Sequence, residues 1–340
     1  MLAQSTMSEN KLARIDYLDI FRSFGIIAMV VGHIWYVRPL DHFIHAFHMP
    51  MFFWISGFLF RHKSKEEQSL LSYIVKKAKT LLLPYCIFGI AHYIFYVVIS
   101  PGQIDTSPLI HLFSVNTYGL PICGALWFLT ALFFTDLLFF LIDRYITYVP
   151  LKIALIACIA LVGSLTKAIF PFTLPFALGP SLVGVGLYYI GHLCRQYASR
   201  AVVQRFMNLS WISTIIFGAM TTFLIFTNGY INMREESYAI LPLFWINAFL
   251  SIVVGINLAK LICKHIQNTI VGKWLIGVGQ NSIVYVCFNQ VVIFAAKKGA
   301  SLLGLRSYVS LIFILVSTLV ILWFLSKMIM NTKLRILVGK

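Results

Sequence analysis

The chain has 340 residues, of which 60% are hydrophobic and only 11% are charged. Soluble domains carry about a quarter charged residues, so this composition excludes a water-soluble globular protein and favours one embedded in a membrane. The formal net charge is +16, but the 27 lysine and arginine residues are scattered between apolar runs and form no basic patch with interleaved aromatic residues. Nucleic-acid binding is therefore not expected.

Long apolar runs follow one another along the chain, separated by short polar segments. Because a membrane offers no water to satisfy backbone amides, each run long enough to cross about 30 Å of hydrocarbon is interpreted as a helix. The sequence predicts an all-α, polytopic integral membrane protein with about ten transmembrane helices in one bundle. The helices are expected over residues 20–36, 43–60, 80–99, 124–142, 149–166, 176–193, 211–228, 239–259, 274–295 and 307–326.

The polar segments between these runs indicate the orientation of the chain. Most of the lysine and arginine residues fall on alternate segments, which the positive-inside rule assigns to the cytoplasm. Both termini are therefore expected to be cytoplasmic, with a short N-terminal segment 1–17, a membrane domain 18–327 and a basic tail 328–340. The loop with Lys297, Lys298 and Arg306 fits this pattern least well, because it is basic on the side predicted to be outside.

The first predicted helix carries three ionisable residues, Asp19, Arg22 and His33. Ionisable side chains within a membrane are costly unless they are paired or face a cavity, so each is a candidate for function. At about 100° per residue, Arg22 and His33 lie about 20° apart around the helix axis, and Asp19 is spaced to pair with Arg22. The helical rise separates Arg22 from His33 by roughly 16 Å, so the two cannot touch one reacting atom.

These positions predict different roles for the three residues. Arg22, one turn in from the cytoplasm, suits a phosphate-bearing group that enters from that side. His33, deeper and toward the outer face, suits proton transfer. Asp19 most simply holds Arg22. In the alternative interpretation, Asp19 and Arg22 only anchor the helix at the interface and His33 donates a hydrogen bond to a backbone carbonyl.

Three histidines repeat every three residues in the second predicted helix, at His42, His45 and His48. They spread over about 120° of a helix and no carboxylate or cysteine is expected to join them, so we predict no metal site. His48 is interpreted as a residue of the reaction cavity, with Pro50 opening the helix beside it. Interfacial packing is the alternative role for His48.

Two further residues are candidates for the acceptor side of the site. Asp136 lies within the fourth predicted helix and must have a partner or a cavity, so it either orients an acceptor or pairs with another helix. Trp127, near the outer end of the same helix, suits stacking against a sugar ring, although tryptophan is also common at membrane interfaces.

Several segments together resemble a known family. They are LDIFRSFGIIAMVVGH, which contains Arg22 and His33, FHMPMFFWISGFLF at 47–60, LLLPY at 81–85, ALWFLTALF at 125–133 and GVGQNSIVYV at 277–286. In this order they resemble the membrane acyltransferase 3 family, particularly its fucose O-acetylase-like branch. The ten helices usual in that family agree with the count above.

The resemblance implies transfer of an acyl group, usually acetyl, from acyl-CoA to a glycan hydroxyl, in a bacterial-type inner (plasma) membrane. It implies that His33 is the essential catalytic residue and Arg22 its partner, with Asn281 of the NSIVYV segment on the acceptor side. Arg61 and Lys63 stand where relatives often carry Arg-x-Arg, so bidentate phosphate binding is lost at Lys63 while its charge remains. Relatives also often carry a histidine near Phe288, which this chain lacks.

A mechanism follows as a hypothesis. Arg22, Arg61 and Lys63 hold the nucleotide of cytoplasmic acyl-CoA, a co-substrate and not a bound cofactor, and the thioester reaches His33. His33 then acts as general base on a hydroxyl of a cell-surface polysaccharide or a lipid-linked sugar, or forms an acyl-histidine intermediate. The acyl group can be acetyl or succinyl. The rival interpretation is a transporter or exporter of the same glycans, although no internal repeat supports it.

Overall fold

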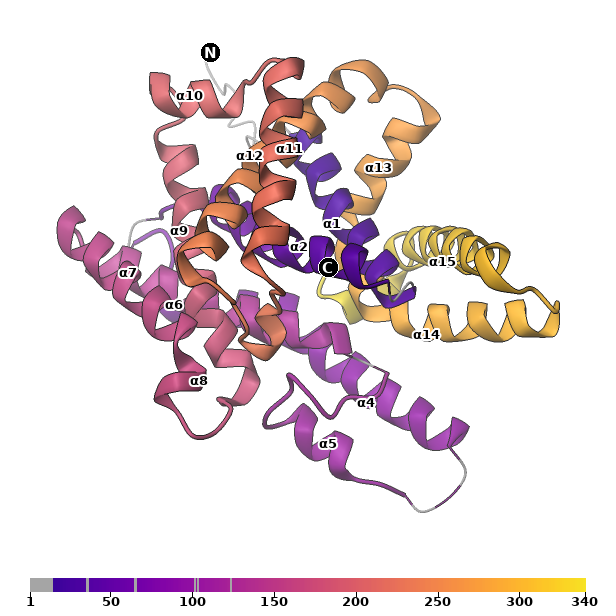
Figure 1. Cartoon of the computed structure of the whole chain (residues 1–340). Coiled ribbons are helices and arrows are strands. Elements are labelled where there is room, and N and C mark those ends of the chain that lie inside the picture. The colour runs from indigo at the N-terminus through magenta and orange to yellow at the C-terminus, as the bar shows by residue number, and fades with distance from the viewer. Residues whose placement is uncertain (1–14, 35–36, 64–65, 101, 103, 123) are drawn as a thin grey trace, which may run out of the picture.

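The chain folds into helices joined by short connections (Figure 1). The computed structural model describes residues 15–34, 37–63, 66–100, 102, 104–122 and 124–340, so residues 1–14 of the expected N-terminal segment lie outside the described part. Within that part there is no β-strand, and Asn232 and Ser237 form an isolated bridge. The all-α prediction is confirmed.

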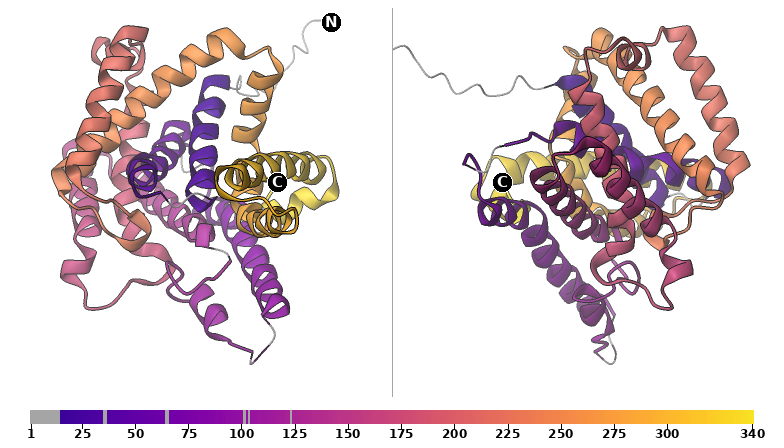
Figure 2. Two further views of the ribbon diagram at one scale, coloured as in Figure 1. Left: turned by 45° about the vertical axis from the view of Figure 1, so that its right-hand side comes forward. Right: turned by 90° about the vertical axis from the view of Figure 1, so that its left-hand side faces the viewer.

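The first half of the chain supplies the central helices. Its helices are α1 (Asp16–Ile34), α2 (Arg38–Leu59), α3 (Leu70–Lys77), the π-helix η1 (Ala78–Leu82), α4 (Leu83–Ile99), α5 (Ser107–Leu112), η2 (Gly124–Leu126), α6 (Trp127–Tyr145), α7 (Val149–Ser164) and α8 (Thr166–Ile169). Figure 2 shows α1 and α2 in the middle of the bundle, with later helices around them.

The second half surrounds this centre. It contains η3 (Pro175–Ala177), α9 (Leu178–Gln196), α10 (Ala201–Met207), α11 (Trp211–Asn228), η4 (Met233–Glu235), α12 (Leu241–Ile266), α13 (Ile270–Gln280), α14 (Ser282–Leu302), α15 (Ser307–Met330) and η5 (Lys333–Val338). Helices α14 and α15 lie side by side at one edge (Figure 1). The predicted tail is packed against the bundle, since Val338 is buried and Lys340 Nζ donates to the carbonyl of Gln280 at 2.7 Å.

Eight of the described helical segments are long and apolar enough to cross a membrane. Helix α7 is shorter, with 16 residues, and α2 is long enough but carries Arg38, Asp41 and three histidines among its 22 residues. The chain is therefore a multi-pass membrane protein. A total of ten crossings, which would include α2 and α7, stays a prediction.

Close backbone contacts fix α2 at the centre. A Cβ atom at Gly57 would collide with the carbonyl of Tyr188 in α9, and one at Gly191 would collide with the carbonyl of Trp54 in α2. Small residues let membrane helices approach in this way, and dispersion contacts then hold them together. The position of α2 matters for function because its N-terminal half carries Asp41, His45 and His48.

The sequence predicts one helix over 274–295, but the structure breaks it at Asn281. This residue has φ −107° and ψ 21°, and it separates α13 from α14. At the end of α13 the carbonyl of Gly279 accepts a hydrogen bond from Arg22 Nη1 at 3.3 Å. Three polar residues, at 280–282, mark the break, but apolar residues continue on both sides, so the hydropathy pattern alone predicts one helix.

Candidate active site

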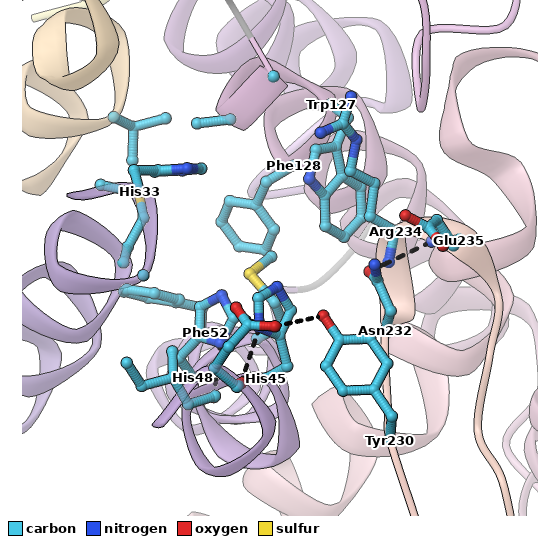
Figure 3. A pocket seen from close by; sticks show the side chains of 18 residues that line it. His33, His45, His48, Phe52, Trp127, Phe128, Tyr230, Asn232, Arg234 and Glu235 are labelled. Carbon is cyan, nitrogen blue, oxygen red and sulfur yellow. Dashed lines mark hydrogen bonds and ion pairs between the residues drawn. The ribbon is translucent and has the colours of Figure 1, made fainter. Parts of the chain in front are cut away.

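A cavity of about 200 Å³ lies where α1, α2, the start of α6, the loop 229–240 and α14 meet. Half of the residues that line it carry polar, charged or amphipathic side chains (Figure 3). The polar and amphipathic side chains around it are His33, Asp41, His45, His48, Trp127, Tyr230, Asn232, Arg234 and Glu235.

His33 reaches this cavity from the last turn of α1 and is half-buried. In Figure 3 it lies on one side of the cavity, across from Trp127 and Arg234. Within the described part of the chain, no group forms a hydrogen bond with the His33 ring. The backbone-carbonyl bond of the alternative interpretation is thus not seen, and the imidazole faces the cavity.

His48 also lines the cavity, from α2. Its Nδ1 lies 2.7 Å from the carbonyl oxygen of Ile44, one turn earlier in the helix. When Nδ1 carries the proton and donates this bond, Nε2 is left as a hydrogen-bond acceptor. His42 is different, because its Nε2 contacts the carbonyl oxygen of Gly229 at 2.7 Å and the residue does not line the cavity.

Trp127 is the first residue of α6 and is buried against the cavity, as is Phe128. The preceding turn, η2, is tied to α14 because the Gly124 N–H donates to Gln290 Oε1 at 2.8 Å. These contacts place two aromatic rings in the cavity wall. The placement suits the sugar-stacking role predicted for Trp127.

The loop 229–240 closes the cavity on a further side. Its two ends are joined, since Asn228 Oδ1 accepts from the Ile240 N–H at 2.9 Å, and its middle is held where the Arg234 Nε–H donates to the Thr117 carbonyl. Asn232 caps η4 by accepting from the Arg234 N–H at 3.1 Å. The loop therefore presents Tyr230, Asn232 and Arg234 to the cavity from a fixed backbone.

A family comparison decides the class of this chain. The acyltransferase 3 family, described as an acyltransferase domain, matches residues 15–327, which is nearly the whole chain. The chain belongs to this acyltransferase family. Comparisons with curated proteins and with solved structures give no match. The protein is thus a multi-pass membrane acyltransferase.

In this acyltransferase, Arg22 lies away from the cavity of His33. Its guanidinium contacts Asp19 Oδ1 at 3.2 Å, as the sequence predicts, and donates to the carbonyl of Gly279. Arg22 therefore connects α1 to the end of α13. Asn281 follows directly and lines a separate groove of about 500 Å³ between α13 and α15.

Arg61 lines a second cleft, of about 680 Å³, at the ends of α2, α6, α7 and α9. Lys152 and Arg195 add positive charge to the cleft, while Asp143 accepts from Lys152 Nζ at 2.7 Å. By the helical rise this cleft begins about 20 Å from His48. Lys63 is exposed and is not among the residues that line either space.

Asp136 also lies outside the cavity. Its carboxylate is buried and forms an ion pair with Lys77, and it accepts a hydrogen bond from the Tyr188 hydroxyl. Of the two roles predicted for it, the structure places Asp136 in the helix-pairing one. Lys77 belongs to α3, so this ion pair fixes α3 against α6 and α9.

Sequence reasoning missed a carboxylate of the cavity. Asp41 is buried, lies 3.0 Å from His45 Nδ1, and accepts a hydrogen bond from the Tyr230 hydroxyl at 2.7 Å. The spacing of Asp41 and His45, four residues apart in one helix, was a signal that could have found the pair. Tyr230 and Arg234 carried no such signal, because they reach the cavity from a distant loop.

Proposed function

We propose that this acyltransferase is an O-acetyltransferase of the fucose O-acetylase-like branch, located in a bacterial-type inner membrane. It transfers acetyl from cytoplasmic acetyl-CoA to a hydroxyl of a cell-surface polysaccharide or a lipid-linked sugar. The observation that carries the proposal is the His33 ring in a polar cavity that also contains Trp127 and Asp41. Aromatic faces and carboxylates are the groups that bind sugars by stacking and hydrogen bonding.

His33 acts as the general base of the reaction. It takes the proton of the acceptor hydroxyl while that oxygen attacks the thioester carbonyl carbon. The carbon–sulfur bond then breaks, and the CoA thiolate takes the proton from the imidazolium, so that His33 returns to its neutral form. In a two-step variant the imidazole itself is acylated and the acceptor hydroxyl then attacks the acyl-histidine.

The donor nucleotide is held at the cytoplasmic side by Arg22, Arg61 and Lys63. The positive charge around Arg61, from Lys152 and Arg195, supports this part of the proposal, since nucleotide phosphates are recognised by such cations. The pantetheine arm then runs along α1 from Arg22 toward His33, a path of roughly 16 Å by the helical rise. Acetyl-CoA enters as a co-substrate, and the reaction needs no resident cofactor or metal.

The test is His33→Ala, compared with His265→Ala as a matched control on an exposed histidine of α12 that does not line the cavity. Both variants are checked for membrane insertion, and acetyl groups on the surface glycan are measured by mass spectrometry. We expect His33→Ala to lose about 100-fold or more of the transfer rate and His265→Ala to retain it.

Two other outcomes would contradict the proposal. Full acetylation in the His33→Ala strain would remove the catalytic role of the imidazole. Loss of the surface glycan with unchanged acetylation of the remaining material would point to export instead of acyl transfer.

A further inference from the structure

One carboxylate oxygen of the cavity lining accepts no hydrogen bond from any residue that the structure describes. The Asp41 side chain is only 6% exposed, and its Oδ2 is satisfied by the Tyr230 hydroxyl at 2.7 Å. Its Oδ1 is buried and accepts no hydrogen bond within the described part of the chain. His45 Nδ1 lies 3.0 Å from this oxygen, but it also lies 3.0 Å from the Asp41 backbone carbonyl, toward which its N–H is aligned.

A buried carboxylate oxygen without a donor is costly, so its presence points to a ligand that supplies the donor. The cavity is the direction from which such a donor can come, since Asp41 lines it. A hydroxyl group matches this position well. It donates one hydrogen bond, carries no charge that would need a counter-ion, and fits beside the tyrosine that already occupies Oδ2.

His45 offers a second hydrogen-bonding position next to the first. Its side chain is 26% exposed and lines the same cavity. With Nδ1 aligned on the Asp41 carbonyl, its Nε2 is left to accept or donate on the cavity side. Asp41 and His45 lie one helical turn apart, with His45 Nδ1 3.0 Å from Asp41 Oδ1, so together they can meet neighbouring hydroxyl groups of one sugar ring.

The opposite side of the cavity supplies an aromatic surface. Figure 3 shows Trp127 and Phe128 facing His45 and His48 across the space, with His33 on a third side. A pyranose ring that stacks on an aromatic face through its C–H groups keeps the hydroxyl groups around its rim free for hydrogen bonds. Its edge would then meet Asp41 and His45, while another hydroxyl is left for His33.

We propose that Asp41 and His45 bind two adjacent hydroxyl groups of a pyranose acceptor and so select the hydroxyl that reaches His33. Tyr230 is the positioning residue, because it holds the Asp41 carboxylate through Oδ2. This inference rests on the proposed function and deepens it. It assigns the acceptor class, a hexose unit with a vicinal diol, and names the residues that set the position of acetylation.

The test uses purified full-length protein in lipid nanodiscs, with Asp41→Asn and His45→Gln. The acceptors are methyl hexopyranosides and their singly deoxygenated analogues. Binding is measured by saturation-transfer difference NMR, and transfer is measured with acetyl-CoA, with the acetylated positions assigned by NMR. His265→Gln is the matched control, because His265 is an exposed histidine in the last turn of α12 and does not line the cavity.

We expect wild type to discriminate against two deoxy analogues at adjacent ring positions. Each of the two variants should lose that discrimination, raise the acceptor KM by about tenfold or more, and leave the KM for acetyl-CoA within twofold. The ratio of positional isomers should also change. A residue that only stabilises the fold would move both KM values, or neither, and would leave the isomer ratio unchanged.

Opposite results have distinct meanings. If wild type transfers acetyl and both variants keep the wild-type acceptor KM and isomer ratio, this inference is overturned while the proposed function stands. If wild type binds the glycosides and discriminates between the deoxy analogues but transfers no acetyl, the proposed function fails while the binding role of Asp41 and His45 stands. Tyr230→Phe keeps the carboxylate and should weaken discrimination less than Asp41→Asn.

Discussion

The Arg22 side chain combines a contact between two helices with a proposed role in donor binding. Its guanidinium contacts Asp19 in α1 and the Gly279 carbonyl at the end of α13, so it holds two helices together. In the proposed function, Arg22 also binds the phosphates of the acetyl-CoA nucleotide. A guanidinium can serve several acceptors at once because its N–H groups point in fixed, separate directions, whereas a lysine ammonium is a compact point charge.

Replacing Arg22 by lysine should therefore keep the charge and lose the multiple contacts. We expect the KM for acetyl-CoA to rise by roughly tenfold, with an acceptor KM close to wild type, as measured by initial rates with each substrate varied in turn. Arg205→Lys, on an exposed residue of α10, is the control. A raised acceptor KM with an unchanged acetyl-CoA KM would reassign Arg22 to the acceptor side.

For single residues, the sequence indicates which buried polar side chains need a partner, but it does not indicate which residue supplies that partner. The requirement that Asp136 have a partner was predictable from its place in an apolar helix, yet its partner Lys77 belongs to a segment that could equally have lain on the headgroups. The bond from Tyr230 to Asp41 spans 189 residues, which no local pattern can report. The place of His33 on the same helix face as Arg22 was predictable, because the angle between two residues of one helix follows from their spacing.

Helix α13 shows how a single glycine sets the position of a helix. A Cβ atom at Gly279 would collide with the backbone carbonyl of Asp19 in α1. At Gly277, two residues earlier in the same helix, a Cβ would meet nothing within 4 Å. The two glycines of the GVGQN segment look alike in the sequence and differ only in what the fold places beside them.

The pair makes a matched experiment. Gly279→Ala should push α13 away from α1, lengthen the bond between Arg22 and the Gly279 carbonyl, and destabilise the protein by about 1–3 kcal/mol. Gly277→Ala should be neutral or stabilising by up to about 1 kcal/mol, because alanine favours a helix over glycine. Thermal unfolding in detergent, followed by fluorescence-detected size-exclusion chromatography, measures both. Equal melting temperatures for the two variants would contradict the close contact.

For whole elements, the apolar runs predicted helix locations well because each run has to satisfy its own backbone in lipid. They predicted the interruptions poorly. The break at Asn281 falls in the short polar segment 280–282, which is too brief to divide an apolar run into two spans, and the π-helical turn Ala78–Leu82 continues directly into α4. Such breaks are set by contacts with other helices, including the hydrogen bond from Arg22 to α13.

For the whole molecule, the number of membrane crossings determines on which side of the membrane each loop lies. Among the residues that the structure describes, eight helical segments qualify as membrane spans by length and composition, and α2 with α7 would raise the number to ten. Both numbers are even, so either one places the two ends of the membrane domain on the same side. The two counts place the segments between α2 and α7 on opposite sides. If only α2 or only α7 crossed the membrane, every loop after that helix would change sides.

With the N-terminus inside, the loop 229–240 lies outside for eight spans and for ten, because it follows both α2 and α7, and it lies inside when only one of these two helices crosses. It also borders the cavity through which the acceptor would arrive, so its side tests the proposed function. The proposed function requires this loop outside and both termini inside. Alkaline phosphatase fused after residue 238 should therefore be active, the same enzyme fused after residue 204 should be inactive, and green fluorescent protein fused after residue 340 should fluoresce. If phosphatase were active after 204 and inactive after 238, the cavity would face the cytoplasm, and an extracytoplasmic acceptor could not reach His33.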